Sequence, residues 1–76
     1  MKPPSPYAQR RMAQRDIAAA EIDYVLAHPD VTYNSKNHPD RRVVEGQTRA
    51  GRTLKVVVLI ADPEFVVTVA DRNSTI

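Results

Sequence analysis

The stretch 52–61, RTLKVVVLIA, contains the longest apolar run of the chain. Successive residues of a strand point to opposite faces, and here both sets are apolar. One face would carry Leu54, Val56, Val58 and Ile60, and the other Val57, Leu59 and Ala61. A strand that is apolar on both faces is usually central and covered twice. We therefore expect this segment to be a central strand, and the run is too short to cross a bilayer.

Three further segments with a strand pattern flank it, at 31–34, 41–47 and 65–70. Turn-forming residues separate them: a polar loop at 34–40, a hairpin turn between Gly46 and Gly51, and Asp62-Pro63-Glu64. Short connections of this kind join antiparallel neighbours. The second half of the chain is therefore predicted to form a four-stranded antiparallel sheet.

Two helices are predicted before the strands. Ser5 followed by Pro6 provides a hydroxyl cap and a proline at the first helical position, which favours a helix over about 6–14. Ile22, Val25 and Leu26 form the apolar stripe of a second helix over about 18–27, extended by alanines 18 and 19 and ended by Pro29. The expected fold class is α+β: two N-terminal helices packed on a four-stranded antiparallel sheet, in the order ααββββ.

We expect one domain over residues 5–70, a disordered lead-in at 1–4 and a polar tail at 71–76. Two helices can cover only one face of the sheet. The second face should then meet the C-terminal tail, another copy of the chain in a homodimer, or another protein partner.

Composition narrows the class of protein. The 76 residues are 42% hydrophobic and 26% charged, which suits a folded domain, and they include no cysteine, which excludes disulfides. The N-terminus lacks the apolar run of a signal peptide. We expect a cytoplasmic protein without membrane attachment.

Charge is segregated along the chain. Residues 1–15 contain bases and no acid, residues 16–30 contain acids and no lysine or arginine, and residues 31–60 are again mainly basic. Such polarity points weakly to a polyanion such as nucleic acid. Ordinary solvated faces explain it equally well.

The segment 5–17, SPYAQRRMAQRDI, resembles the opening motif of a family catalogued as domain of unknown function 4258, which has a His-Ala pair, an Arg-Met and an Arg-Gly-Ile. Later matches are Glu21-Ile22, Val25-Leu26, Pro29, Val44, Gly46, Gly51-Arg52, Leu54-Lys55-Val56-Val57 and Val67-Thr68-Val69. The family histidine falls on Tyr7, its glycine on Asp16, and its helix-capping hydroxyl on Ala18. The resemblance implies the two-helix, four-strand fold. It also implies kinship with RelE-like and barnase-like ribonuclease toxins of toxin–antitoxin or phage systems.

Ribonuclease chemistry needs a base, an acid and cations around the reacting phosphate. The candidate catalytic residues are Tyr7, Arg11, Arg15 and His38, with Tyr33 as a further aromatic that could transfer a proton or stack on a base. The candidate nucleic-acid-binding residues are Arg11, Arg15, Arg42, Arg52 and Lys55. The hypothesis requires the arginines of the first helix and of the hairpin to converge in one cleft.

Structural alternatives exist for each candidate. Paired helix arginines are commonly solvated or paired with acids such as Glu21, His38 could be an exposed bystander, and Arg52 could simply anchor the hairpin turn. The two histidines form no metal motif, and no cofactor signature is present. Two functions therefore stay open: a metal-independent endoribonuclease toxin that acts on RNA, or a non-catalytic module that binds nucleic acid or a host protein.

Overall fold

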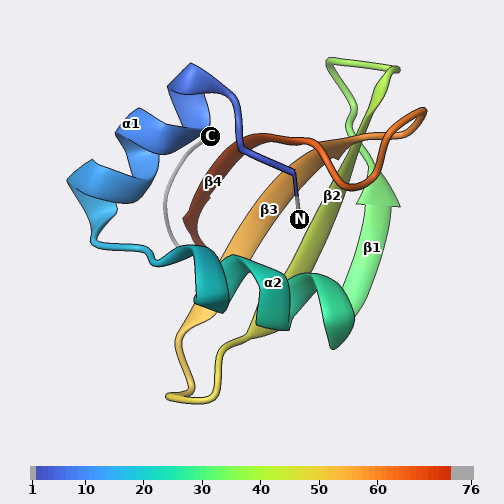
Figure 1. The fold of residues 1–76 in the computed structure, drawn as a ribbon. Helices are drawn as coiled ribbons and strands as arrows, with labels where there is room; N and C mark the ends of the chain where they lie inside the picture. The colour runs from blue at the N-terminus through green and yellow to red at the C-terminus, as the bar shows by residue number, and fades with distance from the viewer. Residues whose placement is uncertain (1, 73–76) are drawn as a thin grey trace.

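The computed structural model describes residues 2–72, which form two helices followed by one four-stranded sheet (Figure 1). The elements are α1 (Pro6–Arg15), α2 (Ala19–Ala27), β1 (Val31–Asn34), β2 (Arg41–Gln47), β3 (Thr53–Leu59) and β4 (Val66–Asp71). The strands lie in the order β1-β2-β3-β4, and each pairs antiparallel with its neighbour. The predicted ααββββ fold is confirmed.

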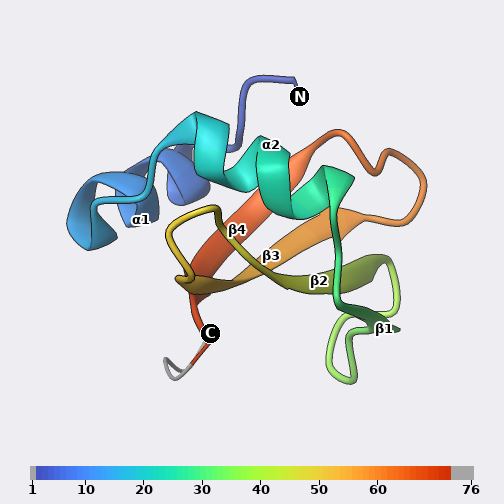
Figure 2. The ribbon, with the colours of Figure 1, turned by 90° about the horizontal axis from the view of Figure 1, so that it is seen from below.

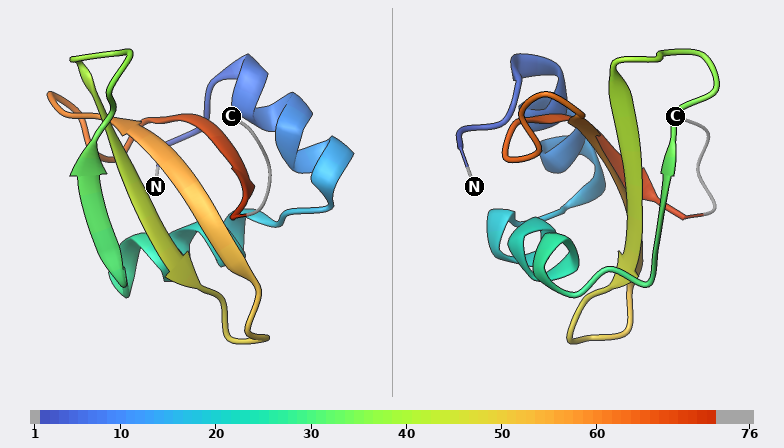
Figure 3. Two further views of the ribbon diagram at one scale, coloured as in Figure 1. Left: turned by 180° about the vertical axis from the view of Figure 1, so that it is seen from behind. Right: turned by 90° about the vertical axis from the view of Figure 1, so that its right-hand side faces the viewer.

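Strand β3 is central, as its apolar pattern predicts, because it pairs with β2 on one side and β4 on the other. Its residues Leu54, Val56 and Val58 are buried beneath the helices. The rest of this core consists of Ala8, Ile17, Ile22, Val25, Val44, Val66 and Val69, with Met12 and Leu26 packed against it. The two helices cover one face of the sheet and leave the other without a helix (Figures 2 and 3).

Helix α1 begins and ends with local signals. The Ser5 hydroxyl accepts a hydrogen bond from the Ala8 N–H at 3.0 Å, and Pro6 occupies the first turn. Asp16 ends the helix in the left-handed conformation, with φ 54°, and the Ile17 N–H donates to the Met12 carbonyl at 2.9 Å. Glycine is the residue that adopts this conformation most easily. Asp16, at the position of the family glycine, is therefore the C-terminal cap of α1.

Helix α2 retains half of a capping box. Ala18 has no hydroxyl to cap the helix, but the Glu21 carboxylate accepts a hydrogen bond from the Ala18 N–H at 2.9 Å. Ile22 and Val25 are buried, whereas Ala18 and its neighbour Ala19 are exposed. The expectation that these alanines extend the apolar stripe was wrong, because the helix turns them away from the sheet.

Gly46 allows α2 to lie close to β2. A Cβ atom at this position would lie 3.2 Å from the His28 carbonyl oxygen and 3.3 Å from Cγ1 of Val25. These distances are tighter than ordinary van der Waals contact, so the glycine sets the spacing between helix and sheet.

The start of the chain lies against β4 and the turn before it. The Ser5 N–H donates to the Val66 carbonyl at 3.0 Å, and the Ser5 hydroxyl donates to the Val67 carbonyl at 2.6 Å. Lys2 forms an exposed ion pair with Asp62 at 2.8 Å. The expected lead-in therefore makes specific contacts from Lys2 onward.

At the other end, Asp71 is the last residue of β4 rather than the first residue of the expected tail. Residue 1 of the lead-in and residues 73–76 of the tail lie outside the described residues. Within residues 2–72, neither helix has the length and apolar character needed to cross a membrane.

Candidate functional site

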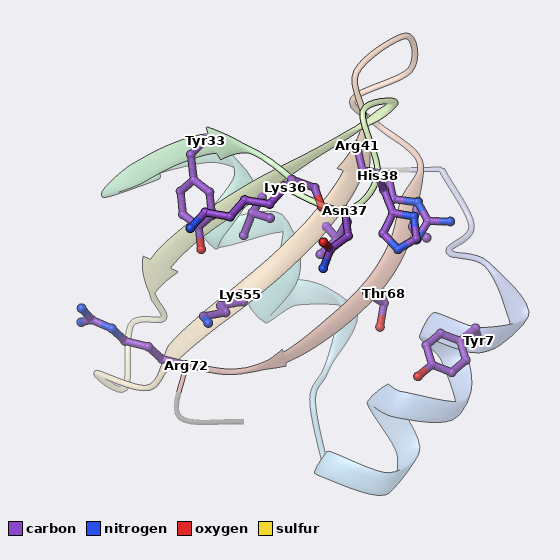
Figure 4. A pocket seen from close by; sticks show the side chains of 13 residues that line it. Tyr7, Tyr33, Lys36, Asn37, His38, Arg41, Lys55, Thr68 and Arg72 are labelled. Carbon is purple, nitrogen blue, oxygen red and sulfur yellow. The ribbon is translucent and has the colours of Figure 1, made fainter. Parts of the chain in front are cut away.

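A cleft of about 710 Å³ lies on the sheet face that the helices leave uncovered (Figure 4). We call it the open-face cleft. Its lining comes from α1, from all four strands and from the loop between β1 and β2. The lining residues are Tyr7, Tyr33, Ser35, Lys36, Asn37, His38, Arg41, Val43, Lys55, Val57, Val67, Thr68 and Arg72.

The register of the sheet builds the floor of this cleft. Tyr33 pairs with Val43, Val43 with Val57, and Val57 with Thr68. Cross-strand partners point to the same face, so these four side chains form one row across the sheet. The row has an aromatic ring at the β1 end, two valines in the middle and a hydroxyl at the β4 end.

Cations border this row. Lys55 lies two residues from Val57 along β3, Arg41 lies two residues from Val43 on the other side of the row, and Lys36 and Arg72 complete the basic set. None of the described lining residues is acidic. Four basic side chains and no acidic one in the lining give the cleft a net positive charge, which attracts anions.

The nearest acid is Glu45, which is engaged at the edge of the cleft. It accepts a hydrogen bond from the Tyr33 hydroxyl and lies 3.7 Å from Nε of Arg72. The hydrogen bond to Glu45 raises the pKa of the Tyr33 phenol above its ordinary value of 10.0. Tyr33 therefore stays protonated at neutral pH, with its ring orientation fixed by the carboxylate.

Two polar atoms of the cleft are buried without a hydrogen-bond partner among residues 2–72. They are Nε of Arg41 and Oγ1 of Thr68, and the Thr68 residue is only 4% exposed. A buried polar group that lacks a partner costs about 1–3 kcal/mol. Both atoms can donate a hydrogen bond, so they are suited to a ligand rich in acceptor oxygens.

The loop between β1 and β2 brings His38 to the cleft. Its two ends are tied to β2, because the Ser35 N–H donates to the Arg41 carbonyl at 3.0 Å and the Arg41 N–H donates to the His38 carbonyl at 3.0 Å. Tyr7 reaches the cleft from α1 and is 53% exposed. In Figure 4, His38, Arg41, Thr68 and Tyr7 lie toward one end, and Tyr33, Lys36, Lys55 and Arg72 toward the other.

Of the residues proposed from the sequence, the structure brings Tyr7, Tyr33, His38 and Lys55 together in the open-face cleft. Arg11 and Arg15 are half-buried on α1 and do not line it. Arg42 pairs with Val58, whose side chain lies in the core beneath the helices, so it points away from the cleft. Arg52 of the hairpin does meet the end of α1, at the Arg15 carbonyl and beside Asp71, but the expected cleft lined by helix and hairpin arginines is not the open-face cleft.

Arg52 has a structural position. Its guanidinium donates to both oxygens of Asp71, at 2.7 and 3.3 Å, and to the backbone carbonyls of Asp16 at 2.8 Å and Arg15 at 2.6 Å. Glu21 lies 3.9 Å away. The hydrogen bonds from Arg52 lower the pKa of Asp71 below its ordinary value of 3.8. Arg52 thus satisfies the free carbonyls at the end of α1 and links them to β4, in keeping with the structural alternative to a phosphate-binding role.

Sequence reasoning missed Lys36, Arg41, Thr68 and Arg72 as cleft residues. The alternation of side chains along a strand could have indicated Thr68. Lys55 and Thr68 each lie one residue from a core valine, Val56 or Val69, and therefore point to the opposite face of the sheet. His28 lies at the end of α2, away from the cleft lining, and its Nδ1 is 3.1 Å from the Tyr24 carbonyl oxygen. In the part of the chain from Lys2 to Arg72, no group of three histidine or acidic side chains is arranged to hold a metal ion.

The model of the family described as Domain of unknown function (DUF4258) matches residues 5–71. No curated protein and no solved structure matches the chain.

Proposed function

The chain belongs to the Domain of unknown function (DUF4258) family, and we propose that it is a cytoplasmic, toxin-like domain of a toxin–antitoxin or phage system that binds single-stranded RNA in the open-face cleft. The observation that carries the proposal is the composition of that cleft. Lys36, Arg41, Lys55 and Arg72 surround an aromatic and aliphatic floor, and no described lining residue is acidic.

The floor favours unpaired RNA over a duplex. Unstacked bases pack on aromatic and apolar side chains, and Tyr33 with Val43 and Val57 offers such a surface. Bases inside a duplex are stacked on one another and cannot reach a sheet floor. The surrounding cations would contact the phosphates, whose neutralisation supplies most of the affinity.

Metal-independent cleavage of the bound RNA is the second candidate function. His38 and Tyr7 line the same end of the cleft as Arg41. One could take the proton of the 2′-hydroxyl and the other could protonate the leaving 5′ oxygen, while Arg41 stabilises the phosphorane. The tyrosine at the position of the family histidine makes His38 the residue on which this activity depends.

Neighbouring residues of β2 provide the test of RNA binding. Arg41 lines the cleft and Arg42 points to the helix side, so Arg41→Ala and Arg42→Ala remove the same charge from opposite faces. We expect Arg41→Ala to weaken binding of a short single-stranded RNA about tenfold. In a plot of the logarithm of the binding constant against the logarithm of the salt concentration, the slope should become shallower by about 0.7. Arg42→Ala should bind like the wild-type protein, as measured by fluorescence anisotropy across a salt series.

Equal effects of the two substitutions would reject the cleft as the binding site. The absence of RNA binding by the wild-type protein would reject the proposed function and leave a protein partner on the uncovered sheet face as the alternative. Incubation with RNA separates the candidates further: cleavage that is lost in a still-binding His38→Ala variant identifies a ribonuclease, and intact RNA identifies a binding module.

A further inference from the structure

The open-face cleft contains a local feature that general attraction for anions does not explain. Thr68 is 4% exposed, lines the cleft and has no hydrogen-bond partner for its hydroxyl among the described residues. Threonine on a sheet floor can be replaced by valine without a change of shape. A hydroxyl at this depth therefore costs stability in the free protein unless a ligand engages it.

Arg41 has the matching feature at the same end of the cleft. Its Nε is buried and also lacks a hydrogen-bond partner among residues 2–72. The nearest carboxylate is that of Asp40, whose side chain is 69% exposed. It lies 3.9 Å from this nitrogen, which is too far for a hydrogen bond. Asp40 thus forms a long, exposed ion pair with the guanidinium but leaves the hydrogen-bond donor at Nε unused.

The register places these two groups on either side of Val57. Thr68 is the direct partner of Val57 on β4, while Arg41 lies on β2 opposite Leu59, two residues further along β3. Neighbouring strands are about 4.8 Å apart, so β2 and β4 are about 10 Å apart across β3. An extended arginine side chain and one phosphate group fill a space of this size.

We propose that Arg41 and Thr68 form a phosphate subsite, in which one phosphodiester group of bound RNA lies over Val57 and accepts hydrogen bonds from Nε of Arg41 and Oγ1 of Thr68. This inference rests on the proposed RNA-binding function and deepens it. With Tyr33 at the opposite end of the same row, the RNA backbone then crosses the strands, from a base stacked on Tyr33 to a phosphate held above Val57.

The substitution Thr68→Val tests the subsite, because the hydroxyl is removed while the shape is kept. We expect affinity for a short single-stranded RNA to fall about tenfold, as for the loss of one hydrogen bond to a charged group. The thermal stability of the free protein should stay equal or rise, since an unpartnered hydroxyl disappears from the interior. This opposite effect on binding and stability is not expected of a residue that only supports the fold.

Thr53→Val is the matched control. Thr53 lies on β3 on the same face but does not line the open-face cleft. Its replacement should leave RNA affinity unchanged. Equal loss of affinity in both variants would overturn the proposal.

Replacing single RNA phosphates by uncharged methylphosphonates identifies the group that is bound. At one position the replacement should weaken binding to the wild-type protein and have a much smaller effect on Thr68→Val, which is the coupling expected of a direct contact. If wild-type protein binds RNA but no position shows this coupling, the subsite is wrong and the proposed function stands. If wild-type protein does not bind RNA, both are overturned.

Discussion

The guanidinium of Arg52 joins the ends of three elements. It donates hydrogen bonds to the last carbonyls of α1 and to the carboxylate of Asp71 at the end of β4. It also lies 3.9 Å from the carboxylate of Glu21 in the first turn of α2. Arginine suits this position because its planar fork donates several hydrogen bonds in fixed directions, which lysine cannot do. A residue that looks like a phosphate ligand in the sequence is thus occupied by the protein's own acceptors.

Replacement of Arg52 should therefore reduce stability. Arg52→Ala removes hydrogen bonds to a carboxylate and two carbonyls, and we expect the free energy of unfolding to fall by about 2 kcal/mol, discounted for partial exposure. Arg52→Lys should lose roughly half as much, because one ammonium cannot reach all acceptors. Exposed Arg10→Ala is the control, with an expected change within about 0.5 kcal/mol in urea unfolding.

The contribution of this contact depends on pH in a defined direction. The folded pKa of Asp71 is lowered from 3.8, so the stabilisation is complete above that value and is lost as pH falls through the lower folded pKa. The difference in stability between wild type and Arg52→Ala should therefore shrink on acidification. A difference that grows toward low pH would contradict the assigned ion pair.

At the scale of elements, the packing of α2 on β2 depends on the missing side chain of Gly46. Gly46→Ala places a methyl group against the His28 carbonyl and Cγ1 of Val25. We expect a loss of about 1 kcal/mol, because crowding outweighs the entropy gained from replacing glycine. The loss should be smaller when Val25 is also shortened to alanine, since one of the two close contacts is then relieved.

Thermal unfolding of the single and double variants measures this coupling. A Gly46→Ala protein as stable as the wild type would show that α2 can move away from β2 without cost.

Element positions followed closely from local sequence signals. The Ser5-Pro6 cap, Pro29 and the turn at Asp62-Pro63 placed the helices and strands to within one or two residues. The third strand ends at Leu59 instead of residue 61, because the chain already turns there: the Asp62 N–H donates to the Leu59 carbonyl at 3.2 Å. Backbone geometry near a turn is not visible in an apolar run.

At the scale of the whole molecule, the grouping of functional side chains was harder to predict. The sequence Arg41-Arg42-Val43-Val44 gives one base and one valine to each face, so it does not reveal which arginine faces the helices. The placement of α1 beside β4 also depends on tertiary packing rather than on local pattern. For these reasons local pattern did not show that Lys55 and His38 line the open-face cleft while the candidate arginines 11, 15, 42 and 52 lie outside it.

The contact between the start of the chain and β4 has a consequence for synthesis. Helix α1 packs against β4 and against no other helix or strand within residues 2–72, and Ser5 bonds to residues 66 and 67. Helix α1 is thus translated well before the strand on which it docks. The nascent domain cannot complete its hydrophobic core until β4 has also left the ribosome, so α1 has to wait for about fifty further residues before it can pack.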